Sequence, residues 1–185
     1  MEHDMYPSEL TGTYTIDPAH SRFGFVARHA MVTKVRGSFP VVEATAHLDA
    51  ADPAASTVRV TLDASGVDTG NPQRDGHLRT VDFLDAETHP HITFTSTGVK
   101  HVDEDAFEVT GRLTIRGVTR EITIPLEFAG TAVDAQGFTR AGFEGSTVIN
   151  RKDYGVSFNA VLETGGVMIS EKITLEFDLS AVKNA

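Results

Sequence analysis

The segment Ile122-Thr123-Ile124-Pro125-Leu126-Glu127-Phe128 places an apolar side chain at every second position, and Ile173-Thr174-Leu175-Glu176-Phe177-Asp178-Leu179 repeats the pattern. Because successive side chains of a β-strand point to opposite faces, each segment predicts a strand with one apolar face. Residues 23–27 and 113–115 follow the same rule. Such strands need a shared dry interior, and a closed barrel supplies one while removing exposed sheet edges.

Further segments of strand-like composition are separated by turn signals such as Asp103-Glu104-Asp105. One helix is expected over residues 71–80, because Asn71 is a suitable N-cap and Pro72 suits the first helical position. A second helical turn is expected at residues 82–87. The fold predicted is all-β with one helix, an antiparallel β-barrel of about eight strands. The strands are expected at residues 14–16, 21–29, 31–39, 41–48, 57–64, 92–98, 106–115, 120–129, 138–149 and 169–179.

Length and composition limit the class of protein. A chain of 185 residues is expected to form one domain, after a flexible lead-in at residues 1–11. The net charge of −10 argues against nucleic acid as a partner, and the lack of a long apolar run argues against stable membrane insertion. Without cysteine, the chain has no disulfide or thiolate metal site. Residues 1–10 carry acids and no apolar signal core, so we expect a cytoplasmic protein.

Asp17, His20 and Ser21 contain the side chains of a hydrolytic triad, but no nucleophile-elbow motif accompanies them. The favoured interpretation is a turn in which these side chains bind the backbone. His89 and His91 are suitable metal ligands, yet the sequence positions no third ligand, so we expect turn or surface histidines and no metal site. No cofactor is expected.

Polar residues at three other places allow two interpretations each. Arg74, Asp75 and His77 are expected to anchor the helix through a buried Arg–Asp pair, with a gate as the alternative. Residues 151–153 are expected to form a solvated turn, with an anionic head-group site at the barrel mouth as the alternative. His29 shares the parity of Phe23, so we expect it to face inward, either as a hydrogen-bonded core residue or as a ligand contact.

Four motifs, in this order, resemble the YceI-like proteins. The first is Asp17-Pro18-Ala19-His20-Ser21-Arg22-Phe23-Gly24-Phe25, followed by His29 and Gly37-Ser38-Phe39. The second runs from Arg74 to Asp85 and continues through His89-Pro90-His91 to Ser96. The third is residues 111–119, and the fourth is residues 151–155 with the closing strand. The resemblance covers about residues 12–182 and implies a single lipocalin-like barrel domain with a helix packed against it.

The resemblance also implies binding of a long apolar ligand, a polyisoprenoid or another long-chain amphiphilic lipid, and a possible homodimer. It carries over no catalytic residue. The leading hypothesis is therefore a non-enzymatic carrier or store of such a lipid. The alternatives are a hydrolase or isomerase acting on a small amphiphile, with His29 as its titrating group, and a structural module with a filled barrel.

Strand parity selects the residues expected to line the ligand tunnel. They are Phe23, Phe25, Ala27, His29, Ile92, Phe94, Leu113, Ile115, Ile122, Ile124, Leu126, Phe143, Ile173 and Leu175.

Overall fold

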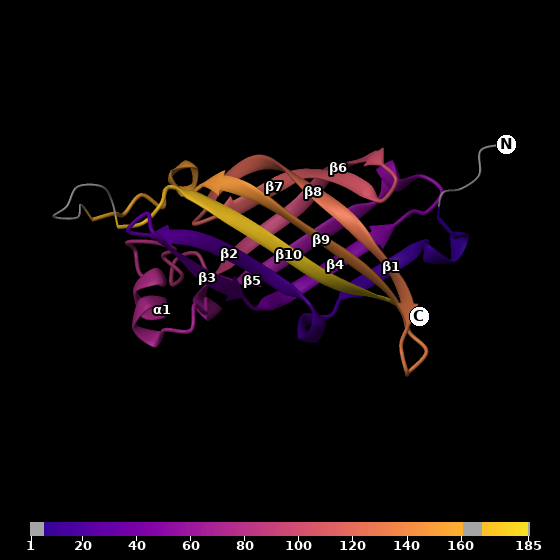
Figure 1. The fold of residues 1–185 in the computed structure, drawn as a ribbon, viewed down its shortest axis with the longest axis horizontal. Coiled ribbons are helices and arrows are strands. Elements are labelled where there is room, and N and C mark those ends of the chain that lie inside the picture. The colour runs from indigo at the N-terminus through magenta and orange to yellow at the C-terminus, as the bar shows by residue number, and fades with distance from the viewer. Residues whose placement is uncertain (1–5, 161–167, 185) are drawn as a thin grey trace.

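The computed structural model describes residues 6–160 and 168–184. Ten strands form one antiparallel sheet that curls into a barrel (Figure 1). The strands are β1 (Gly12–Ile16), β2 (Arg22–His29), β3 (Thr33–Phe39), β4 (Val41–Leu48), β5 (Thr57–Asp63), β6 (His91–Asp103), β7 (Ala106–Ile115), β8 (Val118–Val133), β9 (Thr139–Asn150) and β10 (Lys172–Lys183). The helices are α1 (Pro72–Leu78) and the 3-10 turns η1 (Ser8–Leu10), η2 (Pro18–His20), η3 (Pro53–Ala55), η4 (Ala64–Gly66) and η5 (Arg151–Tyr154).

The barrel closes because β10 pairs with β9 along one edge and with both β1 and β2 along the other. β1 and β2 are two halves of one long strand interrupted by η2, and β3 and β4 are halves of the next, interrupted at Pro40. Counted in this way, eight strands run up and down around the barrel, as predicted. Closure leaves few unpaired backbone groups along the sheet.

A gap in the wall lies beside β3, because among the described residues the outer edge of this strand meets only an isolated bridge between Ser38 and Asp68. The segment that contains α1 packs against one end of the barrel, near β3 (Figure 1). The Asn71 side chain caps α1 by accepting a hydrogen bond from the amide of Arg74, as predicted. The helix ends at Leu78, and residues 82–87 form turns rather than the second helical turn expected from the sequence.

A correction concerns how α1 is anchored. Arg74 and Asp75 do not pair; both bind Thr69 instead. The buried Asp75 carboxylate accepts from the Thr69 amide (2.9 Å) and hydroxyl (2.6 Å), and Arg74 Nε donates to the same hydroxyl (2.7 Å). A hydroxyl both donates and accepts, so the Thr69 hydroxyl satisfies both side chains at once. The alternation of side chains along strands does not predict the position of a loop residue such as Thr69.

Other boundaries differ from the expected ones because pairing extends beyond the apolar stretches. β6 continues to Asp103 and β8 to Val133, where long hairpins extend past the core. β10 begins at Lys172, later than expected, because the Ser170 side chain and backbone bind the end of β2 at Arg28. The bend expected near Ala30 is present, with Ala30 and Met31 at positive φ.

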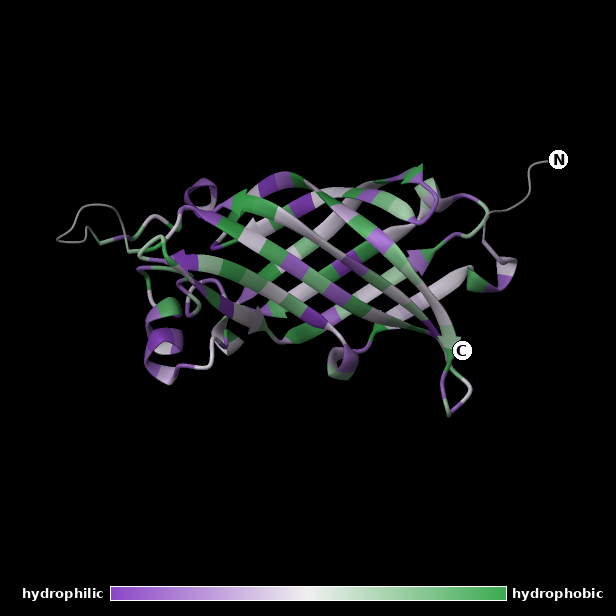
Figure 2. Ribbon diagram, viewed as in Figure 1, coloured by the Kyte–Doolittle hydropathy of each residue, from purple (hydrophilic) through white to green (hydrophobic). Residues whose placement is uncertain are grey.

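Figure 2 shows hydrophobic and hydrophilic residues alternating along the strands, as a barrel with an apolar interior requires. The interior holds two clusters of buried apolar residues. The larger includes Phe23, Leu62 and Phe94 near the α1 end, and the smaller is built on Tyr14, Ala141 and Ala181. Within the described residues, no helix has both the length and the apolar content needed to cross a membrane.

Candidate ligand-binding cavity

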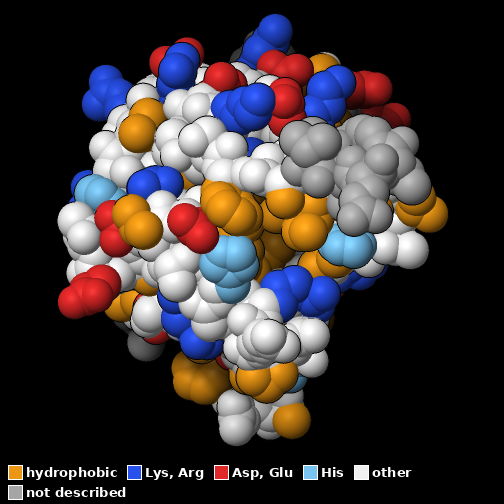
Figure 3. Space-filling model, turned by 90° about the vertical axis from the view of Figure 1, so that its left-hand side faces the viewer, with side chains coloured by type: hydrophobic (Ala, Val, Ile, Leu, Met, Phe, Trp, Pro, Cys, Tyr) orange, Lys and Arg blue, Asp and Glu red, His pale blue; other side chains and the backbone are white. Residues whose placement is uncertain are grey.

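An apolar cavity of about 210 Å³ lies inside the barrel at the α1 end. Residues from strands around the barrel form its walls. Leu78, at the end of α1, and Leu84, in the turns after it, complete them. Seen from this end, hydrophobic side chains line the bottom of a hollow whose rim carries histidine and basic side chains (Figure 3). The cavity is therefore accessible from the end of the barrel that α1 partly covers.

Twelve of the fourteen residues selected by parity lie on the cavity wall. They are Phe23, Phe25, Ala27, Ile92, Phe94, Leu113, Ile115, Ile122, Ile124, Leu126, Ile173 and Leu175. Contact between these side chains and a ligand stays a prediction. Two residues are placed elsewhere. His29 is exposed at the end of β2, so the inward orientation expected for it is wrong. Phe143 lines a different compartment, described below.

The wall also contains residues that parity did not select. Leu62 shares a face with Val58 and Val60, a pattern visible in the sequence, and all three line the cavity. Phe39, on the half-strand β3, packs against Phe25 with the two ring centroids 5.3 Å apart. Others come from irregular segments, including Phe83, Val156 and Ile169. Periodicity could not have found these, because irregular backbone has no fixed alternation of faces.

Three polar side chains lie among the cavity-lining residues that the structure describes: Thr93, Arg151 and Tyr154. Arg151 and Tyr154 both belong to η5, which Asn150 caps and Gly155 ends with a φ of 75°. Side chains three positions apart eclipse one another in a 3-10 helix. Arg151 and Tyr154 are therefore both buried, while the two residues between them are exposed.

Arg151 is buried, which corrects the expectation that residues 151–153 form a wholly solvated turn. Its guanidinium donates to four backbone carbonyls, those of Val156 (2.7 Å), Phe158 (2.8 Å), Ser170 (2.9 Å) and Ile169 (3.4 Å). Burial lowers the pKa of Arg151, and the Glu171 carboxylate acts in the opposite direction. A buried guanidinium with these partners fixes the chain on either side of the cavity rim, and most of its donors are engaged.

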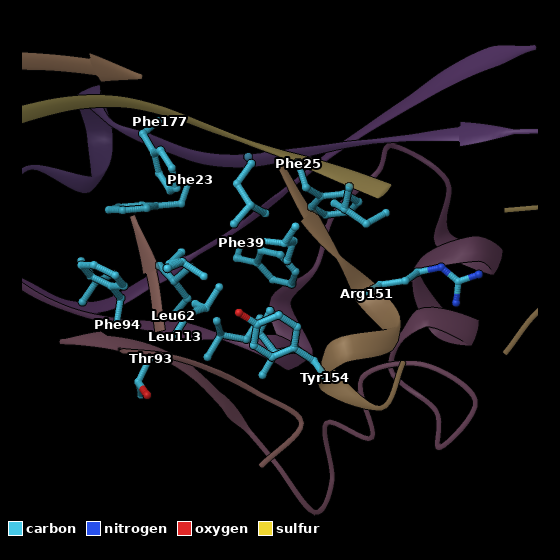
Figure 4. A pocket seen from close by; sticks show the side chains of 18 of the residues that line it. Phe23, Phe25, Phe39, Leu62, Thr93, Phe94, Leu113, Arg151, Tyr154 and Phe177 are labelled. Atoms are coloured by element: carbon cyan, nitrogen blue, oxygen red, sulfur yellow. The ribbon is translucent and has the colours of Figure 1, made fainter. Parts of the chain in front are cut away.

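Tyr154 differs from Arg151 in having no partner. Its side chain is 2% exposed, and its hydroxyl makes no hydrogen bond to any described residue. Figure 4 shows this hydroxyl pointing into the cavity toward Leu62 and Phe39, while Arg151 points to the other side. Burial raises the pKa of Tyr154 to about 12, so the hydroxyl remains protonated at neutral pH.

A second apolar compartment of about 130 Å³ continues toward the opposite end of the barrel. Phe143, Phe128 and Leu48 line it, and Tyr6 packs against Phe128 at a centroid distance of 5.5 Å. The structure thus places the lead-in against the barrel from Tyr6 onward; residues 1–5 lie outside the described residues. Four side chains line both compartments and separate them: Val58, Val109, Leu126 and Leu179.

The polar side chains of the turn at residues 17–21 have structural partners, whereas His89 is half-buried and His91 exposed after α1. Asp17 caps η2 through the amide of Ala19 (2.9 Å), contacts His20 Nδ1 (2.8 Å) and accepts from Arg140 (2.8 Å), while Ser21 exchanges hydrogen bonds with the Ser180 backbone. This is the turn that we expected, and none of its three polar side chains lines either compartment. Its hydrogen bonds, first from Arg140 and then from His20, lower the pKa of Asp17 to about 2.

His77 packs its ring against Phe83 (5.0 Å) and Phe158 (5.3 Å) and contacts the Asp82 carboxylate at 2.9 Å. It therefore helps to hold the segment after α1 at the cavity rim. Over the described parts of the chain, no three His, Asp or Glu side chains come together in a way that could hold a metal ion.

Comparison with known proteins gives consistent matches over most of the chain. A family model for the YceI-like domain matches residues 14–181. A UPF0312 protein of Azotobacter vinelandii is 39% identical over 149 residues, which cover 80% of this chain and 78% of that protein. A UPF0312 protein of Staphylococcus aureus is 37% identical over 164 residues, which cover 88% of this chain and 93% of that protein.

Solved structures share the fold. BcnA of Burkholderia cenocepacia superposes with a TM-score of 0.78 at 25% identity, covering 89% of this chain and 98% of that one. The Campylobacter jejuni YceI protein gives a TM-score of 0.71 at 28% identity, covering 85% and 90%. A polyisoprenoid-binding domain of Saccharophagus degradans gives a TM-score of 0.66, covering 92% and 98%, and at 17% identity it shows the fold alone.

Proposed function

This chain belongs to the family of YceI-like domains, and from that premise we propose that its barrel binds a long apolar ligand, a polyisoprenoid or a related amphiphilic lipid, for carriage or storage. The observation that carries the proposal is the cavity, whose walls are almost entirely apolar on the strands that line it. The polyisoprenoid-binding domain of similar fold adds support for this ligand class.

The physical basis is burial of apolar surface. Each Å² removed from water contributes about 25 cal/mol, so a long tail supplies most of the affinity without specific contacts. Lost translational freedom and frozen rotors offset part of that gain. Ligand pockets usually enclose about 300 to 1,000 Å³. Neither compartment reaches that range alone, and the two joined just reach its lower limit. We therefore expect side chains between them to rotate when a long tail enters.

We propose binding rather than catalysis. The enzyme hypothesis relied on His29 as a titrating group inside the cavity, and His29 is exposed outside it. Of the polar side chains that line the cavity, Arg151 is held by backbone carbonyls and Tyr154 remains protonated. The filled-barrel hypothesis has no support from an interior that leaves two compartments open.

A cytoplasmic location and a homodimer stay predictions of this proposal. Light scattering on the purified chain tests the dimer, and a mass of one chain would contradict it.

The decisive experiment is native mass spectrometry of gently purified protein, followed by organic extraction. We expect an added mass of several hundred daltons, about one ligand per chain, as for a single small-molecule site. The Val148→Trp variant, changed at an exposed position of β9, serves as a control and should retain the ligand. Ligand-free protein from the native host that also takes up no prenol or fatty amide in solution would refute the proposal.

A further inference from the structure

The buried hydroxyl of Tyr154 is the group in the cavity that the proposed function does not explain. It lies in an apolar wall, and the residues described in the structure give it no hydrogen-bond partner. A buried polar group without a partner is costly, and native proteins rarely keep one without a reason. Phenylalanine would fill the same space without that cost.

The surroundings of Tyr154 determine what could bind to it. The hydroxyl faces Leu62 and Phe39, which offer no acceptor (Figure 4). A phenol is protonated at neutral pH, so the hydroxyl presents a hydrogen-bond donor to the cavity. A ligand atom that accepts a hydrogen bond from this hydroxyl must therefore be an oxygen or similar acceptor inside the cavity, within about 3 Å of it.

Charge narrows the ligand further. Arg151 is the one cationic side chain among the described residues that line the cavity, and its guanidinium is engaged by four backbone carbonyls. A diphosphate or carboxylate beside Tyr154 would be desolvated in the apolar cavity, and no other cationic side chain among the described lining residues is there to compensate it, which is strongly unfavourable. A neutral carbonyl, ether or amide oxygen meets both conditions.

We propose that Tyr154 is a specificity-determining residue that donates a hydrogen bond to a neutral oxygen of the bound lipid, so that the polar end of the ligand lies inside the cavity beside η5 and its tail extends toward the second compartment. This inference rests on the proposed function and adds to it the class of head group and the direction of the ligand. The ligand class is a prenyl or acyl lipid with a carbonyl-type head.

The test compares three probes of similar tail length by displacement of the neutral fluorophore diphenylhexatriene from lipid-stripped full-length protein. They are geranylgeranylacetone, which is a prenyl ketone, the hydrocarbon with the same carbon skeleton, and geranylgeranyl diphosphate. We expect the wild type to bind the ketone about tenfold more tightly than the hydrocarbon, and more tightly than the diphosphate. In Tyr154→Phe, the ketone should lose this advantage while hydrocarbon binding is unchanged.

Thermal unfolding of the ligand-free proteins gives a second readout. Because the hydroxyl has no protein partner, Tyr154→Phe should unfold at the same temperature as the wild type or a higher one. A melting temperature several degrees lower would mean that the hydroxyl has a structural partner, and would overturn the inference.

The outcomes separate the inference from the proposed function. If the wild type binds ketone and hydrocarbon equally, or prefers the diphosphate, then lipid binding stands and the role of Tyr154 is refuted. If none of the three probes displaces the fluorophore and none is detected by native mass spectrometry, the proposed function itself fails.

Discussion

Replacing Leu179 by Trp should set an upper limit on the tail length that the barrel can bind. Leu179 lines both compartments, so an indole at this position fills the passage between them. Tails that end within the first compartment should bind as in the wild type. Tails that reach beyond the passage should lose the contribution of every unit that would have crossed it.

The length at which this happens follows from the strand geometry. In β7, Ile115 lines the first compartment and Val109 lines the passage, six positions further back along the strand. A rise of about 3.4 Å per residue and a tilt of about 40° place them about 16 Å apart along the barrel axis. A prenyl unit has four main-chain bonds of about 1.5 Å and extends about 5 Å. The first compartment therefore holds about three units.

The energy per unit follows from the usual ligand efficiency. At about 0.3 kcal/mol per non-hydrogen atom, a five-carbon unit contributes about 1.5 kcal/mol, which is about tenfold in affinity. In the wild type, affinity should rise by about this factor from farnesol to geranylgeraniol and again to geranylfarnesol. In Leu179→Trp, the rise should stop after farnesol, which leaves geranylfarnesol about a hundredfold weaker than in the wild type.

Displacement of diphenylhexatriene measures these affinities across the prenol series. Val148→Trp, with its indole on the outside of the barrel, is the matched control and should follow the wild type at every length. Circular dichroism and melting temperature check that Leu179→Trp is folded, since overpacking costs about 1 to 3 kcal/mol. The reasoning is wrong if folded Leu179→Trp follows the wild type at all lengths, or if the wild type gains nothing beyond farnesol.

Three further predictions concern uptake, stability and pH. Ala27→Trp should reduce uptake of all prenols, because Ala27 lines the first compartment; unchanged uptake by a folded variant would remove Ala27 from the ligand site. Arg151→Met should lower the free energy of unfolding in urea by about 3 to 5 kcal/mol, since four carbonyls lose their donor. Lys152→Met removes only a solvent-exposed ion pair with Glu171 and should cost less than about 1 kcal/mol; equal effects would contradict the anchoring role. The pKa of Asp17 is lowered to about 2 in the folded protein, so its stabilising contribution is present above its ordinary pKa near 4 and is lost as the pH falls toward 2. Asp17→Asn should unfold with a weaker pH dependence over that interval in acid titrations followed by circular dichroism, and an unchanged slope would refute the assignment.

Alternation of apolar side chains made most of the cavity wall predictable. Residues such as Ile122, Ile124 and Leu126 lie on a continuous regular strand, where a side chain's direction follows from its position alone. His29 failed the same rule because it ends β2 beside the turn at Ala30, where the strand leaves the barrel wall. Phe143 does face inward. Alternation predicts the face of a strand on which a side chain lies but not its position along the barrel axis, so it could not predict which compartment Phe143 lines.

The sequence by itself determined the strands, the single helix with its Asn71 cap and the apolar character of the interior, because these depend on neighbours within a few positions. Only the tertiary structure decided the role of η5 and the division of the interior into two compartments. Arg151 and Tyr154 belong to one short motif with the appearance of a charged surface turn. Arg151 binds carbonyls of the following segment and of the distant residues Ile169 and Ser170, whereas the Tyr154 hydroxyl has no partner among the described residues. Burial and hydrogen bonding of a side chain depend on which parts of the chain close around it, and that information is not local in sequence.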